Sequence, residues 1–77
     1  MTDAEYLTEV GMRVLAARLR RRLSQHAFAE RVPMSRVTLG SVERGQHVAT
    51  LTTYRRLAAA LGVDVGDLVT ERVRTWR

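Results

Sequence analysis

Arginine is the residue type in this chain that is best suited to binding a ligand. All 13 lysine-or-arginine positions are arginines, and none is a lysine. Residues 10–56 hold ten of these arginines against only two acids, Glu30 and Glu43. The planar guanidinium donates paired hydrogen bonds, a geometry that suits phosphate groups and the edge of guanine. The segment is therefore predicted to recognise phosphate groups or guanine.

The rest of the composition excludes most enzymatic and metal chemistry. The chain has no cysteine, and its two histidines, His26 and His47, have no neighbouring set of acidic or metal-ligating residues. We therefore expect no enzymatic activity, no metal, no cofactor and no small-molecule ligand. The apolar runs are short and interrupted by arginine, which excludes a membrane-spanning helix or signal peptide and favours a cytoplasmic protein.

Two short helices joined by a tight turn are predicted within residues 23–45. The same helix start signal, a capping serine flanked by an apolar pair, occurs twice: Leu23, Ser24 and Phe28, then Met34, Ser35 and Leu39. The expected helices cover Gln25 to Arg31 and about Arg36 to Arg44, with Gly45 as the stop. This spacing is typical of a helix-turn-helix, whose second helix enters the major groove of DNA.

Three further helices are predicted around this pair. The first runs from a capping box at Thr2 and Glu5 to about Arg21, with a buried stripe of Leu7, Val10, Val14 and Ala17. Arg18 falls inside that apolar arc, so its charge needs a partner. A fourth helix, capped by Thr50 and ending at Gly62, buries Tyr54, Leu57, Ala58 and Leu61. Asp64 is expected to cap a fifth helix.

These elements predict one compact, all-α, five-helix domain over residues 1–77, with the helix-turn-helix at about 24–45. No segment has the alternating pattern of a strand. A chain of 77 residues is long enough for one small core.

The outward face of the third helix differs from an ordinary solvated face. Leu39 and Val42 point to the core, which leaves Val37, Gly40, Ser41 and Arg44 on the opposite side. Glycine costs about 1 kcal/mol in a helix interior relative to alanine. Close approach of another surface would justify that cost, and an indifferent surface glycine is the alternative.

The sequence resembles the Cro and lambda-repressor-like helix-turn-helix family over about residues 13–69. The matching positions are Leu23, Ser24, Gln25, Phe28, Ala29, Met34, Ser35, Leu39, Val42, Glu43 and Gly45, followed by residues 57–63. The resemblance implies base contacts by Arg36, Val37 and Ser41, and phosphate contacts by Gln25 and Ser35. It also implies a partly buried structural ion pair between Arg18 and Glu43. Pro33 replaces the family's turn glycine, whose positive φ proline is not expected to reach, so the turn is expected to differ.

Several contacts have competing interpretations. Arg36 suits the N7 and O6 of guanine or, alternatively, a phosphate. Val37 suits a thymine methyl group or serves as a spacer against the sugar backbone. Arg44 and His47 are expected at phosphates, with plain solvent exposure as the alternative. The run Arg20–Arg22 is either a solvated helix end or a surface that steers DNA.

The fifth helix, expected over about 65–75, carries a candidate homodimer surface. Its apolar stripe comprises Val65, Val69, Val73 and Trp76. A two-fold dimer reads two half-sites about 34 Å apart, which one module cannot do. The alternative is that Trp76 folds back over the first helix.

The predicted function is a sequence-specific, DNA-binding transcriptional regulator that acts as a homodimer on double-stranded DNA. Suitable settings are a phage-type repressor, a controller of a restriction–modification operon or an autoregulating antitoxin. The alternative is a protein-interaction module of the same fold, which a salt-independent partner would favour.

Overall fold

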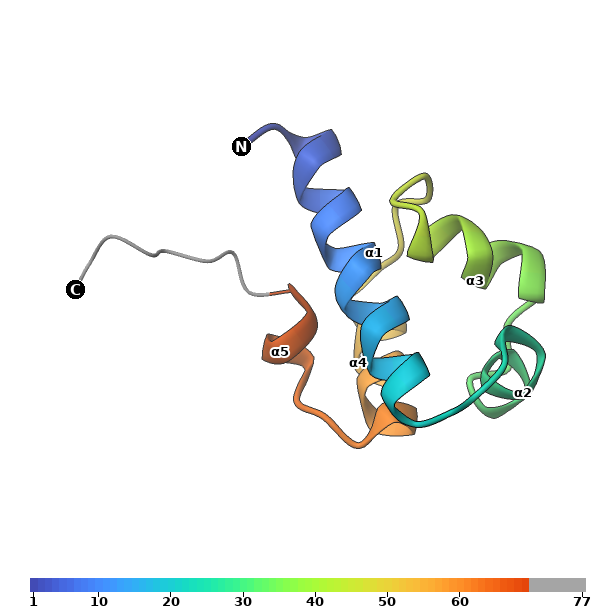
Figure 1. The fold of residues 1–77 in the computed structure, drawn as a ribbon. Coiled ribbons are helices and arrows are strands. Elements are labelled where there is room, and N and C mark those ends of the chain that lie inside the picture. The colour runs from blue at the N-terminus through green and yellow to red at the C-terminus, as the bar shows by residue number, and fades with distance from the viewer. Residues whose placement is uncertain (70–77) are drawn as a thin grey trace.

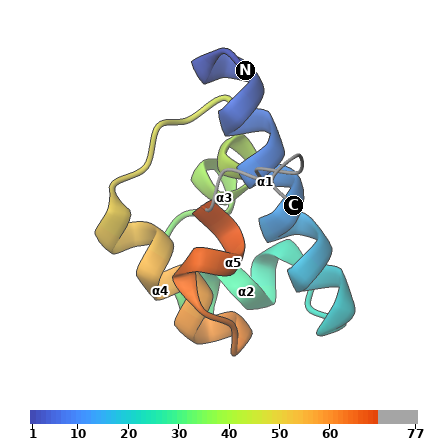
Figure 2. The ribbon, with the colours of Figure 1, turned by 90° about the vertical axis from the view of Figure 1, so that its left-hand side faces the viewer.

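The computed structural model describes residues 1–69, and these form five helices without a strand. The helices are α1 (Asp3–Arg20), α2 (Gln25–Arg31), α3 (Arg36–Glu43), α4 (Leu51–Leu61) and α5 (Val65–Val69). In Figure 1, α2 and α3 lie on one side of α1 and α5 lies on the other. Figure 2 shows the loop from α3 to α4 running past α1, with α5 in front of α4. The predicted all-α class is confirmed. Within residues 1–69, no helix is long and apolar enough to cross a membrane.

The helix starts lie where the capping signals predict them. Thr2, Ser24, Ser35 and Thr50 each accept a hydrogen bond from the backbone N–H three residues on, at 2.9–3.2 Å. Glu5 also accepts from the Thr2 N–H, and this hydrogen bond holds the pKa of Glu5 below its usual value. At the start of α5, the Asp64 N–H donates to the Asp67 carboxylate. The side chain of Asp64 had been expected to cap this helix, so the observed hydrogen bond differs from the prediction.

Helices α1 to α4 end in the same backbone turn. A residue with a positive φ follows each of them: Gly62 directly after α4, and Arg22, Pro33 and Gly45 two residues after the ends of α1, α2 and α3. In each turn the next N–H bonds back to a carbonyl five residues earlier, as from Met34 to Ala29 at 3.1 Å. This pattern satisfies carbonyls that the helix leaves unpaired. Glycine is the residue that adopts such a φ without strain.

Pro33 corrects one expectation from the sequence. Its φ is 23°, so the turn keeps the left-handed backbone that proline was expected to exclude. The Met34–Ala29 hydrogen bond holds this turn closed, and α3 begins at Arg36 as predicted. Proline prefers a φ near −65°, so the backbone is strained at this residue.

We expect Pro33→Gly to stabilise the protein by about 1 kcal/mol. The substitution removes a strain of about 1–3 kcal/mol, part of which is offset by the extra freedom of glycine in the unfolded chain. Urea denaturation followed by circular dichroism measures the difference. Pro33→Ala is the control, because alanine removes the ring but keeps the penalty for a positive φ. A loss of stability in Pro33→Gly would contradict this account of the turn.

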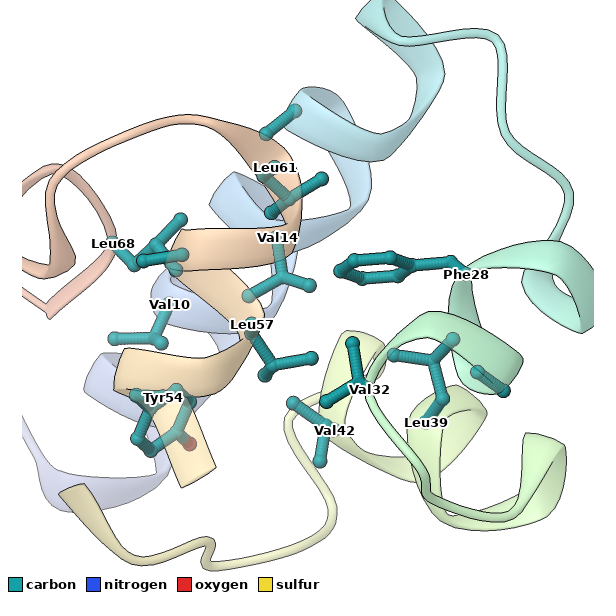
Figure 3. Close-up of a cluster of buried hydrophobic side chains, with 13 residues drawn as sticks. Val10, Val14, Phe28, Val32, Leu39, Val42, Tyr54, Leu57, Leu61 and Leu68 are labelled. Carbon is teal, nitrogen blue, oxygen red and sulfur yellow. The ribbon is translucent and has the colours of Figure 1, made fainter. Parts of the chain in front are cut away.

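The core lies where α1, α2, α3 and α4 meet, and α5 closes one side. Figure 3 shows Phe28 reaching from α2 toward Val14 on α1. Val14, Phe28, Leu39 and Leu57 are fully buried. The predicted stripe of α1 is correct except at Leu7, which is only half-buried. Leu7 lies near the start of α1, where it lines an open groove together with Tyr6 and Val69.

Two tyrosines join α1, α4 and the end of α5. Tyr54 on α4 is buried, and burial raises the pKa of its hydroxyl, partly opposed by a hydrogen bond with the backbone of Ala49. The Tyr6 hydroxyl on α1 donates to the carbonyl of Val69. The short α5 is therefore tied to α1 by a polar contact as well as by the burial of Leu68.

Candidate nucleic-acid interface

A buried polar cluster holds α3 against the rest of the domain. Arg18 donates to the Glu43 carboxylate through both Nε (2.7 Å) and Nη2 (3.2 Å). Its third nitrogen, Nη1, donates to the carbonyl of Leu23 at 2.8 Å. Gln25 Nε2 donates to the same carboxylate at 2.9 Å. One carboxylate on α3 therefore binds α1 and the first residue of α2 at once.

The cluster supplies the partner that Arg18 was expected to need. Arg18 and Glu43 are only 8% and 6% exposed, so their charges are largely removed from water. Each finds its partner within hydrogen-bond distance, as a buried charge requires. Within residues 1–69, no buried side-chain nitrogen or oxygen lacks a hydrogen-bond partner. The place of Gln25 in this cluster was not predicted from the sequence, because the family resemblance implied only a phosphate contact for this residue.

Two glycines bring α1 and the end of α3 close together. A Cβ on Gly11 of α1 would lie 2.4 Å from the Val42 carbonyl oxygen, and one on Gly45 would lie 2.6 Å from the Thr8 Cα. Neither contact leaves room for a methyl group. The role of Gly11 was not predicted, although a glycine inside a helix often indicates a close approach of another segment. With the ion pair, these contacts fix the direction of α3.

The start of α3 presents Arg36 and Val37 to solvent. Val37 is 77% exposed, whereas the other aliphatic side chains of α3, Leu39 and Val42, are buried. Ser35 caps this helix: its hydroxyl accepts from the Thr38 N–H and donates to the Thr38 Oγ1 at 2.8 Å. The Ser35 hydroxyl is therefore engaged within the protein, while Arg36 and Val37 face outward.

Arg44 folds back over the middle of α3. Its Nε donates to Gln46 Oε1 at 3.1 Å, and its Nη2 to Ser41 Oγ at 3.4 Å. A Cβ on Gly40 would lie 3.1 Å from Arg44 Nη1 and 3.6 Å from Gln25 Nε2. Gly40 is therefore buried beneath these two side chains, which corrects its expected place on the exposed face.

The other arginines and histidines divide between structural and exposed positions. Arg21 donates from Nε to the carbonyl of Leu61 at 2.8 Å, so it caps the end of α4. That contact was not foreseen in the run Arg20–Arg22. His47 is exposed in the loop after α3, and the exposed His26 Nε2 lies 3.5 Å from the Glu30 carboxylate.

Four of the predicted contact residues, Gln25, Arg36, Val37 and Arg44, line a single shallow depression between α2 and α3, together with Gly40. Ser35 and His47 do not line it. Ser41 adjoins it through its hydrogen bond with Arg44. Of the predicted dimer residues, Val65 and Val69 are partly buried against the core. Val73 and Trp76 lie outside the described residues.

Comparison with known proteins shows which family has this arrangement of helices. A family model described as a helix-turn-helix domain matches residues 9–71. The chain belongs to this helix-turn-helix family. It is 39% identical over 62 residues to the immunity repressor protein of Bacillus phage phi105, a match that covers 80% of this chain and 43% of the repressor. The chain thus spans less than half of that relative.

Two solved structures share the fold of this helix-turn-helix domain. The restriction-modification controller protein C.AhdI from Aeromonas hydrophila is 34% identical, with a TM-score of 0.78 over 80% of this chain and 94% of C.AhdI. The DNA-binding domain of BldD is 32% identical, with a TM-score of 0.79 over 90% of this chain and 99% of that domain. These matches confirm the resemblance to Cro and lambda-repressor-like regulators.

Proposed function

We propose that this helix-turn-helix protein is a sequence-specific transcriptional regulator that places α3 in the major groove of double-stranded DNA. The observation that carries the proposal is the exposed start of α3, with Arg36 and Val37 outward, on a helix fixed by the Arg18–Glu43–Gln25 cluster. A helix held this rigidly presents its side chains without further ordering on binding. Membership of the family supports the same reading.

The proposed roles follow the orientation of each side chain. Arg36 and Val37 contact base edges from the first turn of α3, and Ser41 contacts a base or supports Arg44 through its hydroxyl. Arg44 and His47 contact phosphates from the far end of the helix. Gln25 and Ser35 contact phosphates at the near end, Ser35 through its backbone N–H because its hydroxyl is engaged in the cap.

We further propose that the protein acts as a homodimer in the cytoplasm and controls its own transcription or that of a neighbouring operon. Val65 and Val69 supply the described part of the dimer surface. Val69 also lines an apolar groove with Tyr6, Val48 and Leu51, where Val48 is 75% and Leu51 62% exposed. Burial of exposed apolar residues of this kind favours association.

The dimer proposal predicts that Val73→Ala combined with Trp76→Ala shifts the protein toward monomer. Both changes remove apolar surface from the predicted stripe of Val65, Val69, Val73 and Trp76. Sedimentation velocity over a range of concentrations measures the shift. A wild-type protein that is monomeric at high micromolar concentration would disprove the dimer.

The base-reading role of Arg36 is tested by two substitutions. We expect Arg36→Ala to weaken binding to the preferred site by about 10–100-fold, since a bidentate arginine–guanine contact discriminates by about 1–3 kcal/mol. Arg36→Lys is the matched control, because it keeps the charge but loses the planar fork. If lysine restores both affinity and sequence preference, Arg36 contacts phosphate and the base-reading role is wrong. Fluorescence anisotropy with specific and scrambled duplexes provides the measurement.

A further inference from the structure

We propose that Gln46 is a positioning residue, which holds the Arg44 guanidinium over α3 in the place from which it binds a DNA phosphate. The inference rests on the proposed function, in which Arg44 contacts a phosphate. It adds a residue outside α3, in the loop toward α4, and a role for Gly40 and Ser41 in the same arrangement. Gln46 acts through Arg44 and does not itself bind DNA.

Two hydrogen bonds and one close approach define where the Arg44 guanidinium lies. Its Nε donates to Gln46 Oε1 at 3.1 Å, and its Nη2 donates to Ser41 Oγ at 3.4 Å. Its Nη1 lies over Gly40, 3.1 Å from the position that a Cβ would occupy there. Each of the three guanidinium nitrogens therefore has a neighbour on α3 or in the loop that follows it.

The backbone of Gln46 is itself anchored to the domain. Its N–H donates to the Ser41 carbonyl at 2.9 Å, in the turn where Gly45 has a φ of 73°. Gly45 also lies against α1, because a Cβ on it would be 2.6 Å from the Thr8 Cα. The acceptor for Arg44 therefore comes from a loop residue whose backbone is already held in the free protein.

Gly40 provides the space in which the Arg44 guanidinium lies. A methyl group on residue 40 would begin 3.1 Å from Arg44 Nη1, closer than an ordinary van der Waals contact. The same methyl group would lie 3.6 Å from Gln25 Nε2, which is an ordinary contact. Gln25 is held by the buried Glu43 carboxylate, so the flexible arginine is the side chain that would move.

This arrangement prepares Arg44 for a phosphate. A guanidinium has more N–H donors than the bonds to Gln46 and Ser41 use, and the remaining donors can form a charge-assisted pair with phosphate oxygens. Among the described residues, no acid lines the depression that Arg44 shares with Gln25 and Arg36. A side chain that is already in place loses less conformational freedom on binding. Without Gln46, the DNA itself has to order Arg44, so affinity falls.

A double-mutant cycle between residues 44 and 46 tests the inference. Gln46→Met keeps the length of the side chain and removes the acceptor, Arg44→Ala removes the guanidinium, and a third variant combines the two. Fluorescence anisotropy gives dissociation constants for the duplex that the wild type selects and for a scrambled duplex. We expect Gln46→Met to weaken binding of both duplexes by about 2–10-fold for each copy of α3, since phosphate contacts carry no sequence information. In the Arg44→Ala background, the same substitution should have no measurable effect.

Val48→Met is the matched control for Gln46→Met. It places the same side chain at another exposed position of the same loop, and we expect it to bind DNA like the wild type. Gly40→Ala should weaken binding as Gln46→Met does, and this loss should also disappear in the Arg44→Ala background. Thermal unfolding checks that each variant is folded. The exposed side chain of Gln46 predicts an unfolding temperature like that of the wild type for Gln46→Met.

Three results would overturn the inference. If Gln46→Met weakens binding equally with and without Arg44, Gln46 contacts DNA directly or supports the fold. If it has no effect in either background, Gln46 does not position Arg44. If it weakens binding of the selected duplex alone, Arg44 reads a base and not a phosphate.

Failure of the proposed function gives a different result. A wild-type protein that selects no sequence contradicts sequence-specific regulation, but the cycle can still be measured on any duplex to which the protein binds through phosphates. A folded wild-type protein that binds no duplex would remove the proposed function and the positioning role together.

Discussion

Replacing Glu43 by alanine is expected to lower the free energy of unfolding by about 3–5 kcal/mol, because it leaves a buried charge without its partner. Glu43 is 6% exposed and accepts from Arg18 at 2.7 Å and from Gln25 at 2.9 Å. Its removal leaves the Arg18 guanidinium in a buried site without its counter-charge. Because domains of this kind are stabilised by about 5–15 kcal/mol in total, the variant approaches global unfolding.

Two control variants show whether the loss of stability comes from breaking the buried Arg18–Glu43 pair or from removing any carboxylate. Glu30 lies on α2 with a side chain 69% exposed beside His26, so Glu30→Ala should change stability by less than about 1 kcal/mol. The double variant Arg18→Met with Glu43→Leu removes both charges together. Its stability should exceed that of Glu43→Ala, because no buried charge is left unpaired. It should stay below that of the wild type, because the Leu23 carbonyl and the Gln25 amide lose their partners. A single Glu43→Ala variant as stable as the wild type would contradict this account.

Gly11→Ala is expected to destabilise the domain by about 1–3 kcal/mol, although alanine is the better helix former by about 1 kcal/mol. The added methyl group would lie 2.4 Å from the carbonyl oxygen of Val42 and 2.6 Å from that of Glu43. Both atoms belong to backbone, so the end of α3 must move away from α1. Movement of α3 is also expected to weaken DNA binding more than the loss of stability alone explains.

Gly40→Ala is the matched control for Gly11→Ala. Its Cβ would meet only the ends of the flexible Arg44 and Gln25 side chains, at 3.1 Å and beyond. We therefore expect unchanged or slightly raised stability from the better helix propensity of alanine. Thermal unfolding of the two variants beside the wild type measures both effects. Equal stability of Gly11→Ala and Gly40→Ala would show that the close approach of α1 and α3 does not matter.

The helix starts were predictable because their signals are local. Ser24 and Ser35 bond to backbone N–H groups three residues away, so a short stretch of sequence contains the whole interaction. The Arg18 position was predictable for a related reason: a charge in an apolar helical arc has to find a partner. Gly45 likewise marked the end of α3 through its own conformational freedom.

The features that were not predicted from the sequence depend mostly on contacts between segments that are distant in the chain. Nothing near Gly11 in the sequence indicates that carbonyl oxygens of α3 lie against it. The role of Gln25 in the buried cluster follows from the crossing of α2 and α3, which brings its amide to Glu43. The left-handed turn at Pro33 opposes the local preference of proline, so reasoning from residue type gave the wrong backbone there.

Selection of duplexes from a randomised DNA pool, at about 150 mM salt to suppress nonspecific phosphate binding, tests the central claim most directly. We predict enrichment of a two-fold symmetric site with half-site centres about 34 Å apart, one contact surface of α3 for each half. Arg36→Ala in the same selection should lose the preference for guanine within each half-site. A folded wild-type protein that enriches no sequence would contradict the claim that α3 reads DNA.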